Sequence, residues 1–260
     1  MNSKQQKLDA FGRLLDIMDE LRVKCPWDKK QTLESLRHLT IEETYELTDA
    51  IINNDLNELK KELGDVLLHI VFYSKIASET NNFDIADVIN SLCDKLIVRH
   101  PHIYGNVKAE TEEQVKENWE QIKLKEGNKS VLSGVAKGTP SIIKALRMQE
   151  KAAQVGFDWQ TPEQVWAKVD EELAELKTEF SINPQSAKTQ SEFGDFLFAL
   201  INLARKYNIN PDDALEQTNN KFLKRFVFVE EKAKNLGKKL TDMTLEEMDN
   251  YWNKAKETGL

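Results

Sequence analysis

Two short acidic stretches, Glu42-Glu43-Thr44-Tyr45-Glu46 and Glu62-Leu63-Gly64-Asp65, decide how this chain folds. Their patterns are E-E-x-x-E and E-x-G-D, separated by about one helix. Both patterns occur again, as Glu171-Glu172-Leu173-Ala174-Glu175 and Glu192-Phe193-Gly194-Asp195. The first pattern recurs at an offset of 129 residues and the second at 130, so their spacing is almost preserved. A repeat this long exceeds a solenoid unit and predicts a duplicated domain.

Glycines and a proline interrupt the helical periodicity between the two copies, from residue 126 to residue 140. We therefore expect an N-terminal domain over 1–126, a linker over 127–140 and a C-terminal domain over 141–260. Apolar residues at three-to-four spacing predict helices over about 8–22, 31–53, 55–77, 84–100, 111–122, 141–153, 161–180, 187–207, 211–235 and 244–257. Thr40 with Glu43 reads as a capping box that divides the second of these. No segment alternates with period two, so the sequence predicts an all-α protein.

The composition narrows the class of protein. The 260 residues are 40% hydrophobic and 31% charged, which suits a helix-rich globular chain. The net charge of −8 argues against a general surface for nucleic acid or anionic membranes. Cys25 and Cys93 lack a zinc or C-x-x-C spacing, and the chain contains neither an apolar signal region nor an 18-residue apolar run. We expect a cytoplasmic protein whose two thiols are buried or idle in a reducing compartment.

The acidic stretches predict a metal site. Glu43 and Glu46 share one helix face, as do Glu62 and Asp65 on the next helix. A short turn near residues 53–55 predicts that these helices are antiparallel neighbours, with four carboxylates facing one another. Like charges raise each other's pKa, and a hard divalent cation removes the conflict. Oxygen-only ligands favour Mg²⁺, Mn²⁺ or Ca²⁺ over zinc.

Two other interpretations of the acidic stretches are open. Glu-rich helices are commonly solvated faces, but these recur with matched spacing, and the second stretch of each copy lies among apolar residues. Gly64 and Gly194 also occupy mid-helix positions that cost about 1 kcal/mol relative to Ala, which suggests close backbone approach or room for a ligand. A di-iron bundle normally needs Glu-x-x-His on two helices. His69 has Ala199 as its counterpart, so we interpret it as a core or interface histidine.

Basic and aromatic residues also recur between the copies. The matching pairs are Lys95 with Arg99, Lys221 with Arg225, Trp119 with Lys123, and Trp252 with Lys256. Cations one turn apart can clamp phosphate oxygens, and a tryptophan beside a lysine can stack a base or simply close the core. Carboxylates with a metal beside such cations are suited to phosphoryl chemistry. The P-loop pattern is absent, which excludes an ordinary P-loop NTPase.

Together these motifs resemble the MazG-type nucleoside triphosphate pyrophosphohydrolases of the all-α NTP pyrophosphatase superfamily. The resemblance runs nearly end to end and includes Cys25-Pro26-Trp27-Asp28, Arg99-His100-Pro101-His102 and the stretch 155–159. It implies two tandem MazG-like helical bundle domains joined by a linker, and a homodimer. It also implies Mg²⁺-dependent hydrolysis of (d)NTPs to nucleoside monophosphate and pyrophosphate by water attack at the α-phosphorus, with Mn²⁺ as a possible substitute.

Site residues follow from the resemblance by position. The metal ligands would be Glu172, Glu175, Glu192 and Asp195, with Glu43, Glu46, Glu62 and Asp65 as their first-half counterparts. Glu171, or Glu42 in the first half, would orient the attacking water beside the ligand Glu172. Around the nucleotide the resemblance implies Lys168, Lys188, Lys221, Arg225 and Trp252, to which the repeat adds Lys256, Lys95, Arg99 and Trp119.

The two halves differ in their cations. Lys188 lies one turn before Glu192, whereas Glu58 occupies the matching position before Glu62. Lys168 corresponds to Leu39. We therefore hypothesise that the C-terminal half is the main catalytic unit. A nucleotide-binding scaffold with little turnover, acting through partners, and a carboxylate-bridged redox protein are the alternatives, and the sequence indicates no base or sugar preference.

Overall fold

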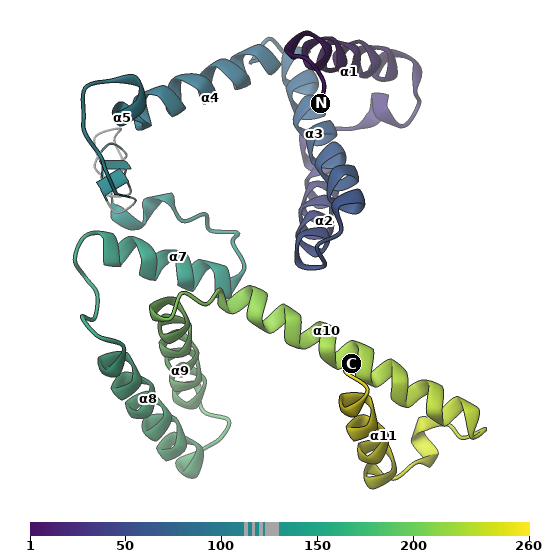
Figure 1. Cartoon of the computed structure of the whole chain (residues 1–260), viewed down its shortest axis with the longest axis vertical. Coiled ribbons are helices and arrows are strands. Elements are labelled where there is room, and N and C mark those ends of the chain that lie inside the picture. Colours follow the sequence, from purple (N-terminus) through teal and green to yellow (C-terminus); the bar gives the residue numbers. More distant parts are fainter. Residues whose placement is uncertain (112–113, 116–117, 120–121, 123–129) are drawn as a thin grey trace. The chain divides into compact units, whose positions relative to one another are not determined.

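The computed structural model describes residues 1–111, 114–115, 118–119, 122 and 130–260, and the chain forms two compact units, Met1–Val115 and Lys116–Leu260 (Figure 1). The described residues form helices and no strands, which confirms the all-α prediction. The division into domains at 126 and 140 stays a prediction, and residues 123–129 lie outside the described part. The helix expected over 111–122 also falls partly outside it. No helix in the described ranges is long and apolar enough to cross a bilayer.

The first unit is built around an antiparallel pair of long helices. Its elements are α1 (Lys4–Lys24), η1 (Asp28–Lys30), α2 (Leu33–Ile52), α3 (Leu56–Ser78), α4 (Ile85–Arg99) and α5 (Pro101–Tyr104). α2 and α3 lie side by side, and α1 packs against α3. Met18, Leu36, Val71 and Phe72 form the buried core where these three helices meet. The turn between α2 and α3 uses Asn54 in a left-handed conformation, with φ of 54°.

Capping residues set the helix ends, though one expected cap is wrong. Asp55 accepts hydrogen bonds from the backbone of Asn57 and Glu58 and begins α3, as its position predicts. α2 begins at Thr32, whose side chain forms a reciprocal capping box with Ser35. The predicted cap at Thr40 is wrong, because α2 runs through it without a break. The Thr40 hydroxyl instead donates to the Leu36 carbonyl at 3.0 Å.

The second unit repeats the helical hairpin and adds three further α-helices among its described residues. Its elements are η2 (Val131–Gly134), α7 (Ser141–Gln154), α8 (Pro162–Ile182), α9 (Ala187–Lys206), α10 (Pro211–Asn235), η3 (Leu240–Asp242) and α11 (Leu245–Glu257). α8 and α9 lie side by side, α7 packs on α9, and α11 folds back on α10 (Figure 1). Val165, Val169, Ala199 and Leu203 make the hairpin core. Pro162 in the first turn of α8, after Thr161, confirms the predicted helix start.

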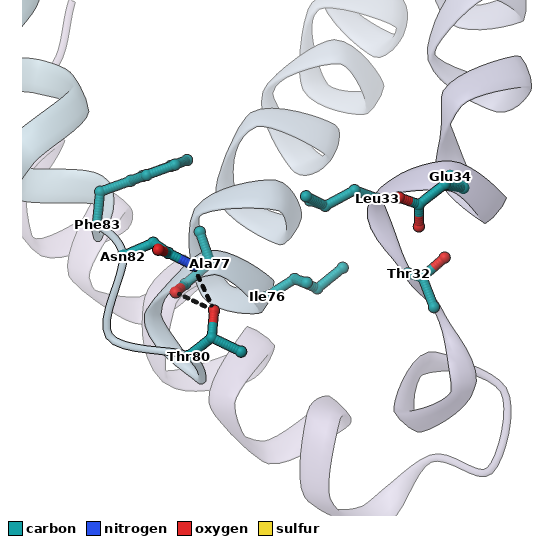
Figure 2. A pocket seen from close by; sticks show the side chains of 8 residues that line it. All are labelled: Thr32, Leu33, Glu34, Ile76, Ala77, Thr80, Asn82 and Phe83. Carbon is teal, nitrogen blue, oxygen red and sulfur yellow. Dashed lines mark hydrogen bonds between the residues drawn. The ribbon is translucent and has the colours of Figure 1, made fainter.

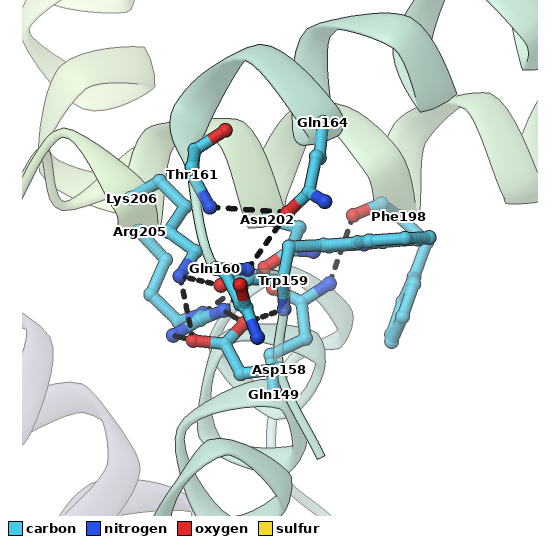
Figure 3. A network of polar contacts seen from close by, with 10 residues as sticks. All are labelled: Gln149, Asp158, Trp159, Gln160, Thr161, Gln164, Phe198, Asn202, Arg205 and Lys206. Atoms are coloured by element: carbon cyan, nitrogen blue, oxygen red, sulfur yellow. Dashed lines mark hydrogen bonds and ion pairs between the residues drawn. The ribbon is translucent and has the colours of Figure 1, made fainter. Parts of the chain in front are cut away.

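The ends of the two hairpins opposite their turns are closed differently. In the first unit, a pocket of about 500 Å³ lies between the start of α2, the end of α3 and the segment that follows α3 (Figure 2). In the second unit, Asp158 pairs with Arg205 and Lys206, and this tethers the loop before α8 to the last turn of α9 (Figure 3). At 1.5 Å per residue, both features lie roughly 15 Å along the helices from the acidic stretches.

Candidate functional site

Each hairpin brings three carboxylates together. In α2 and α3, one carboxylate oxygen from each of Glu43, Glu62 and Asp65 lies within 4.8 Å of the others. In α8 and α9, Glu172, Glu192 and Asp195 form the matching triplet within the same distance. The i, i+3 spacing on one helix and the antiparallel packing of its neighbour produce this geometry. The structure therefore brings together six of the eight predicted metal ligands.

The triplets are partly buried. Glu62 is 3% exposed and Glu172 is 7% exposed. Burial, followed by the charges of Asp65, Glu46 and Glu62, raises the pKa of Glu43. Burial, followed by the charges of Glu175 and Asp195, raises the pKa of Glu192. Each hairpin therefore holds carboxylates in mutual repulsion, which a bound cation would relieve.

The donor atoms fit a hard divalent cation. Glu62 Oε2 is buried and has no hydrogen-bond partner, so this oxygen retains its capacity to bind a cation. All three donors in each triplet are carboxylate oxygens, the ligand type that Mg²⁺ and Mn²⁺ prefer. Neither triplet includes a histidine among the described residues, so the structure gives no support to the di-iron alternative.

The two remaining predicted ligands lie beside the triplets. Glu46 is exposed and belongs to neither group, but Glu62 is the first cause of its raised pKa. Glu175 is likewise exposed, and its charge contributes to the raised pKa of Glu192. Both side chains thus stand next to a triplet.

A lysine pairs with each triplet, but it comes from a different helix in each half. Lys168 on α8 contacts Glu172 at 2.6 Å and Glu171 at 2.9 Å. Lys61 on α3 contacts Glu62 at 2.9 Å and Glu58 at 3.3 Å. The hydrogen bonds to Glu172 and Glu62, respectively, raise the pKa values of the two lysines.

Comparing the two halves of the sequence did not single out Lys61, because Lys61 matches neither Lys168 nor Lys188 in position. Adjacency to Glu62 was its one available signal.

Lys188 stands at the turn end of the α8–α9 hairpin, where it forms an ion pair with the buried carboxylate of Glu179. Hydrogen bonding to Glu179 comes first among the causes that raise the Lys188 pKa, and the charges of Glu192 and Glu175 add to it. Sequence reasoning did not single out Glu179. Its position one turn after Glu175 was the only signal that could have found it.

The predicted base-stacking residues lie on the α10–α11 hairpin. The Arg225 guanidinium is 5.8 Å from the centre of the Trp252 ring, and the Phe222 ring is 5.0 Å from it. Arg225 Nε donates to the Leu260 carbonyl at 2.7 Å. Lys221 and Lys256 are exposed, and Lys256 contacts Asn253 within α11. These contacts of Arg225, Trp252 and Lys256 join α10, α11 and the chain end, and none of them reaches the carboxylate triplet.

The other first-half candidates are spread over separate elements. Lys95 is exposed and Arg99 is half-buried on one face of α4. Trp119 is half-buried, while Lys123, its predicted companion, lies outside the described residues. The candidate water-orienting residues, Glu42 and Glu171, are both exposed beside their triplets, and Glu171 contacts Lys168 at 2.9 Å.

His69 belongs to a polar network behind the first triplet. His69 Nδ1 lies 2.7 Å and the Tyr73 hydroxyl 2.5 Å from Thr40 Oγ1. Burial lowers the His69 pKa, against the opposing charge of Asp65. The matching positions in the second half are apolar: Val169, Ala199 and Leu203. The interpretation of His69 as a core residue is consistent with its 7% exposure.

Of the six apolar residues next to the second acidic stretches, four are exposed, whereas Val66 and Phe196 are half-buried. Leu63 and Leu67 on α3 are 52% and 38% exposed, and Phe193 and Leu197 on α9 are 47% and 45% exposed. Helical geometry turns these side chains away from the hairpin core. A Cβ added at Gly64 or Gly194 would also meet no atom within 4 Å. The prediction of close backbone approach within the chain is therefore wrong, and both glycines face open space.

Comparisons with known proteins agree with this architecture. The sequence model of the MazG nucleotide pyrophosphohydrolase domain matches residues 31–104. The chain is 43% identical over 251 residues to "Nucleoside triphosphate pyrophosphohydrolase/pyrophosphatase MazG" of Thermotoga maritima, which covers 95% of each chain. It is 39% identical over 257 residues to "Nucleoside triphosphate pyrophosphohydrolase" of Escherichia coli K12, covering 96% of this chain and 98% of that one. "Uncharacterized protein YabN" of Bacillus subtilis is 46% identical over 98% of this chain and 54% of its own length.

Proposed function

The chain belongs to the MazG nucleotide pyrophosphohydrolase family, and from that premise we propose that this enzyme hydrolyses nucleoside triphosphates to the monophosphate and pyrophosphate with Mg²⁺. The observation that carries the proposal is the triplet of Glu172, Glu192 and Asp195 with Lys168 and Lys188 beside it. A triphosphate brings negative charge to a site that already holds carboxylates. Both a cation at the triplet and the two flanking lysines are needed to offset it.

Different carboxylates of the C-terminal half would bind the metal ion and accept the proton from water. Glu172, Glu175, Glu192 and Asp195 would hold Mg²⁺, which when bound neutralises phosphate charge and makes water easier to deprotonate. Glu171 would accept a proton from the water that attacks the α-phosphorus, because its carboxylate is exposed beside the triplet.

The cations would secure the substrate. Lys168 and Lys188 would bind phosphate oxygens as compact charges. From α10 and α11, Lys221, Arg225, Trp252 and Lys256 would bind the nucleotide, with Trp252 offering a flat face for a base.

We propose the C-terminal half as the main catalytic unit. The N-terminal triplet has matching carboxylates, and its ligands would be Glu43, Glu46, Glu62 and Asp65, with Glu42 in the place of Glu171. Its lysine, Lys61, is bonded to Glu62 and Glu58, and Leu39 and Glu58 occupy the positions of the two flanking cations. A site that lacks those two cations binds a triphosphate less well.

A homodimer is part of the proposal. Each hairpin leaves large apolar side chains in water: α3 exposes Leu56, Leu63, Leu67 and Ile70, and α9 exposes Phe193, Leu197 and Phe198. A second copy of the chain offers the same kind of surface, and burying the two against each other satisfies both. Sedimentation equilibrium tests this, and a monomer at micromolar concentration would contradict it.

Hydrolysis of ATP in ¹⁸O-labelled water tests the reaction. With Mg²⁺ present we expect AMP and pyrophosphate, with the label in AMP, because water attacks the α-phosphorus. Label in pyrophosphate would contradict that position of attack, and ADP with phosphate would contradict the reaction itself. The protein carrying Glu172→Ala and Glu175→Ala is the control for contaminating activity, and excess EDTA should abolish turnover.

A further inference from the structure

Glu179 is a buried carboxylate to which the reaction above assigns no role. It lies on α8 near the turn to α9, and it is 8% exposed. It forms an ion pair with the Lys188 ammonium, whose side chain is 67% exposed on α9. A charged group is seldom buried without a partner, and here that partner reaches in from the solvent. The pair therefore joins a fixed anion to a cation that would otherwise move freely.

The pair continues the row of carboxylates along the hairpin. Glu179 follows Glu175 by one turn on α8, and Lys188 precedes Glu192 by one turn on α9. The charges of Glu192 and Glu175 act on Lys188 in addition to its bond with Glu179. The ammonium is thus held one helical turn from the triplet, at its turn-proximal end, while Lys168 contacts Glu172 directly.

The first half shows that a hairpin does not require this pair. Ala50, buried on α2, corresponds to Glu179, and Glu58 on α3 corresponds to Lys188. The α2–α3 hairpin nevertheless forms with the same carboxylate triplet. Both members of the ion pair are absent together from the half that lacks the flanking cations. A purely structural explanation of Glu179 therefore has a counterexample in the same chain.

We propose that Glu179 is a positioning residue that holds Lys188 ready for the outer phosphates of the nucleotide, an inference that rests on the proposed function of the C-terminal half. An ammonium has three N–H donors, and one bond to Glu179 leaves two for phosphate oxygens. A free lysine side chain loses rotamer freedom when it binds, and fixing it beforehand reduces that loss. Because Glu179 is on the buried side of the pair, it restrains the lysine without entering the phosphate site.

The test is a double-mutant cycle of Glu179→Gln and Lys188→Gln with ATP and Mg²⁺. Each single variant should raise KM about fivefold and change kcat less than twofold, because the lost contact binds the substrate and not the transition state specifically. The double variant should have the KM of Lys188→Gln alone, because Glu179 acts only through that lysine. Calorimetry with pyrophosphate should show the same pattern of weakened binding, which gives a measurement independent of turnover.

The outcomes separate this inference from the proposed function. If Lys188→Gln leaves KM unchanged, the assignment of Lys188 to the phosphates fails. If Lys188→Gln raises KM and Glu179→Gln does not, only the positioning role fails. A loss of kcat in Glu179→Gln, or a KM effect that multiplies with that of Lys188→Gln, would show a structural role and overturn the inference.

Two further variants complete the design. Glu150→Gln is the control variant. It removes a carboxylate that pairs with Arg147 on α7 and should leave KM and kcat unchanged. If Glu179→Gln fails to fold, Glu179→Ala replaces it in the cycle, because Ala50 shows that the hairpin accommodates alanine there. The same outcomes then apply.

Discussion

The α2–α3 and α8–α9 hairpins hold the same three carboxylates and neutralise them differently. In the second hairpin, Lys168 and Lys188 flank the triplet from α8 and α9. In the first, Lys61 is the lysine that contacts the triplet among the described residues, from the same helix as the buried Glu62. Carboxylate geometry follows from helix spacing and survives changes elsewhere. The cations depend on single positions, so one copy of a duplicated site can lose its cations while it keeps its carboxylates.

The two hairpins also differ in their core residues and in the ion pairs at the ends opposite their turns. Thr40, His69 and Tyr73 form a hydrogen-bonded network where the second hairpin has only apolar side chains. At the open end, Arg22 pairs with Glu79 in the first unit, whereas Asp158 pairs with Arg205 in the second. The tether is an arginine–carboxylate pair in both, with different elements supplying each charge. Similar hairpins can therefore be held by different chemistry.

Removing the carboxylates of each half in turn tests most directly whether the two hairpins differ in activity. Glu172→Ala with Glu175→Ala should reduce pyrophosphate release by about a hundredfold or more, because it removes two proposed metal ligands from the site that carries the cations. Glu43→Ala with Glu46→Ala should reduce it less than about threefold. Both variants are assayed with ATP and saturating Mg²⁺. Equal losses would contradict the asymmetry of the two halves.

The next largest effect is expected on stability, from the ion pairs of Asp158 with Arg205 and Lys206 in the second unit. Asp158→Asn should lower the free energy of unfolding by about 2 kcal/mol at pH 7, because Arg205 and Lys206 lose their half-buried partner. Urea unfolding followed by circular dichroism measures this. Glu79→Gln is the matched variant in the first unit, where Arg22 loses its partner in the same way.

The effect of Asp158→Asn depends on pH. Burial alone would raise the Asp158 pKa, but hydrogen bonds from Arg205 and Lys206 outweigh it and lower the pKa below the ordinary 3.8. The stabilisation is therefore complete above the unfolded-state pKa and is lost as pH falls through the folded-state value. The difference between the two proteins should shrink below about pH 4. A difference that stays constant to pH 2 would show that charge is not the cause.

The flanking lysines sharpen the comparison further. Lys168→Met should raise KM for ATP about tenfold, the equivalent of one charge-assisted hydrogen bond to phosphate. Lys61→Met, the matched change in the first half, should alter KM less than twofold because Lys61 is 60% exposed and bonded to local carboxylates. Steady-state kinetics measure both. A larger effect from Lys61→Met would place substrate in the N-terminal half.

Helix positions were predictable from the sequence to within a few residues, because caps and apolar spacing act locally. Asp55 and Asp84 begin their helices as expected. Thr40 with Glu43 has the sequence of a capping box, but it lies in the middle of α2, where the Thr40 hydroxyl bonds the Leu36 carbonyl and His69. A local pattern does not reveal that a stronger cap, Thr32 with Ser35, lies eight residues earlier.

The carboxylate triplets were also predictable, because two short-range rules suffice: i, i+3 spacing and an antiparallel turn. Partners across the hairpin were harder to predict. Glu179 with Lys188 and Asp158 with Arg205 join residues from different elements, and single-helix periodicity carries no information about such pairs. The exposure of Leu63, Leu67, Phe193 and Leu197 beside E-x-G-D was not predictable either, because periodicity identifies an apolar face without saying whether this chain covers it.

The smallest expected effect concerns the polar network behind the first triplet. Tyr73→Phe removes a hydroxyl that lies 2.5 Å from Thr40, while Thr40 keeps its bonds to His69 and the Leu36 carbonyl. The free energy of unfolding should fall by about 1 kcal/mol, the usual contribution of one hydrogen bond. Tyr207→Phe is the control in the second unit, where the exposed hydroxyl contacts Trp166 at 3.2 Å and its loss should cost less. Pyrophosphate release should stay within about twofold for both variants. A large loss of turnover in Tyr73→Phe alone would mean that the network supports chemistry at Glu43, Glu62 and Asp65, and the N-terminal hairpin would then be a second active site.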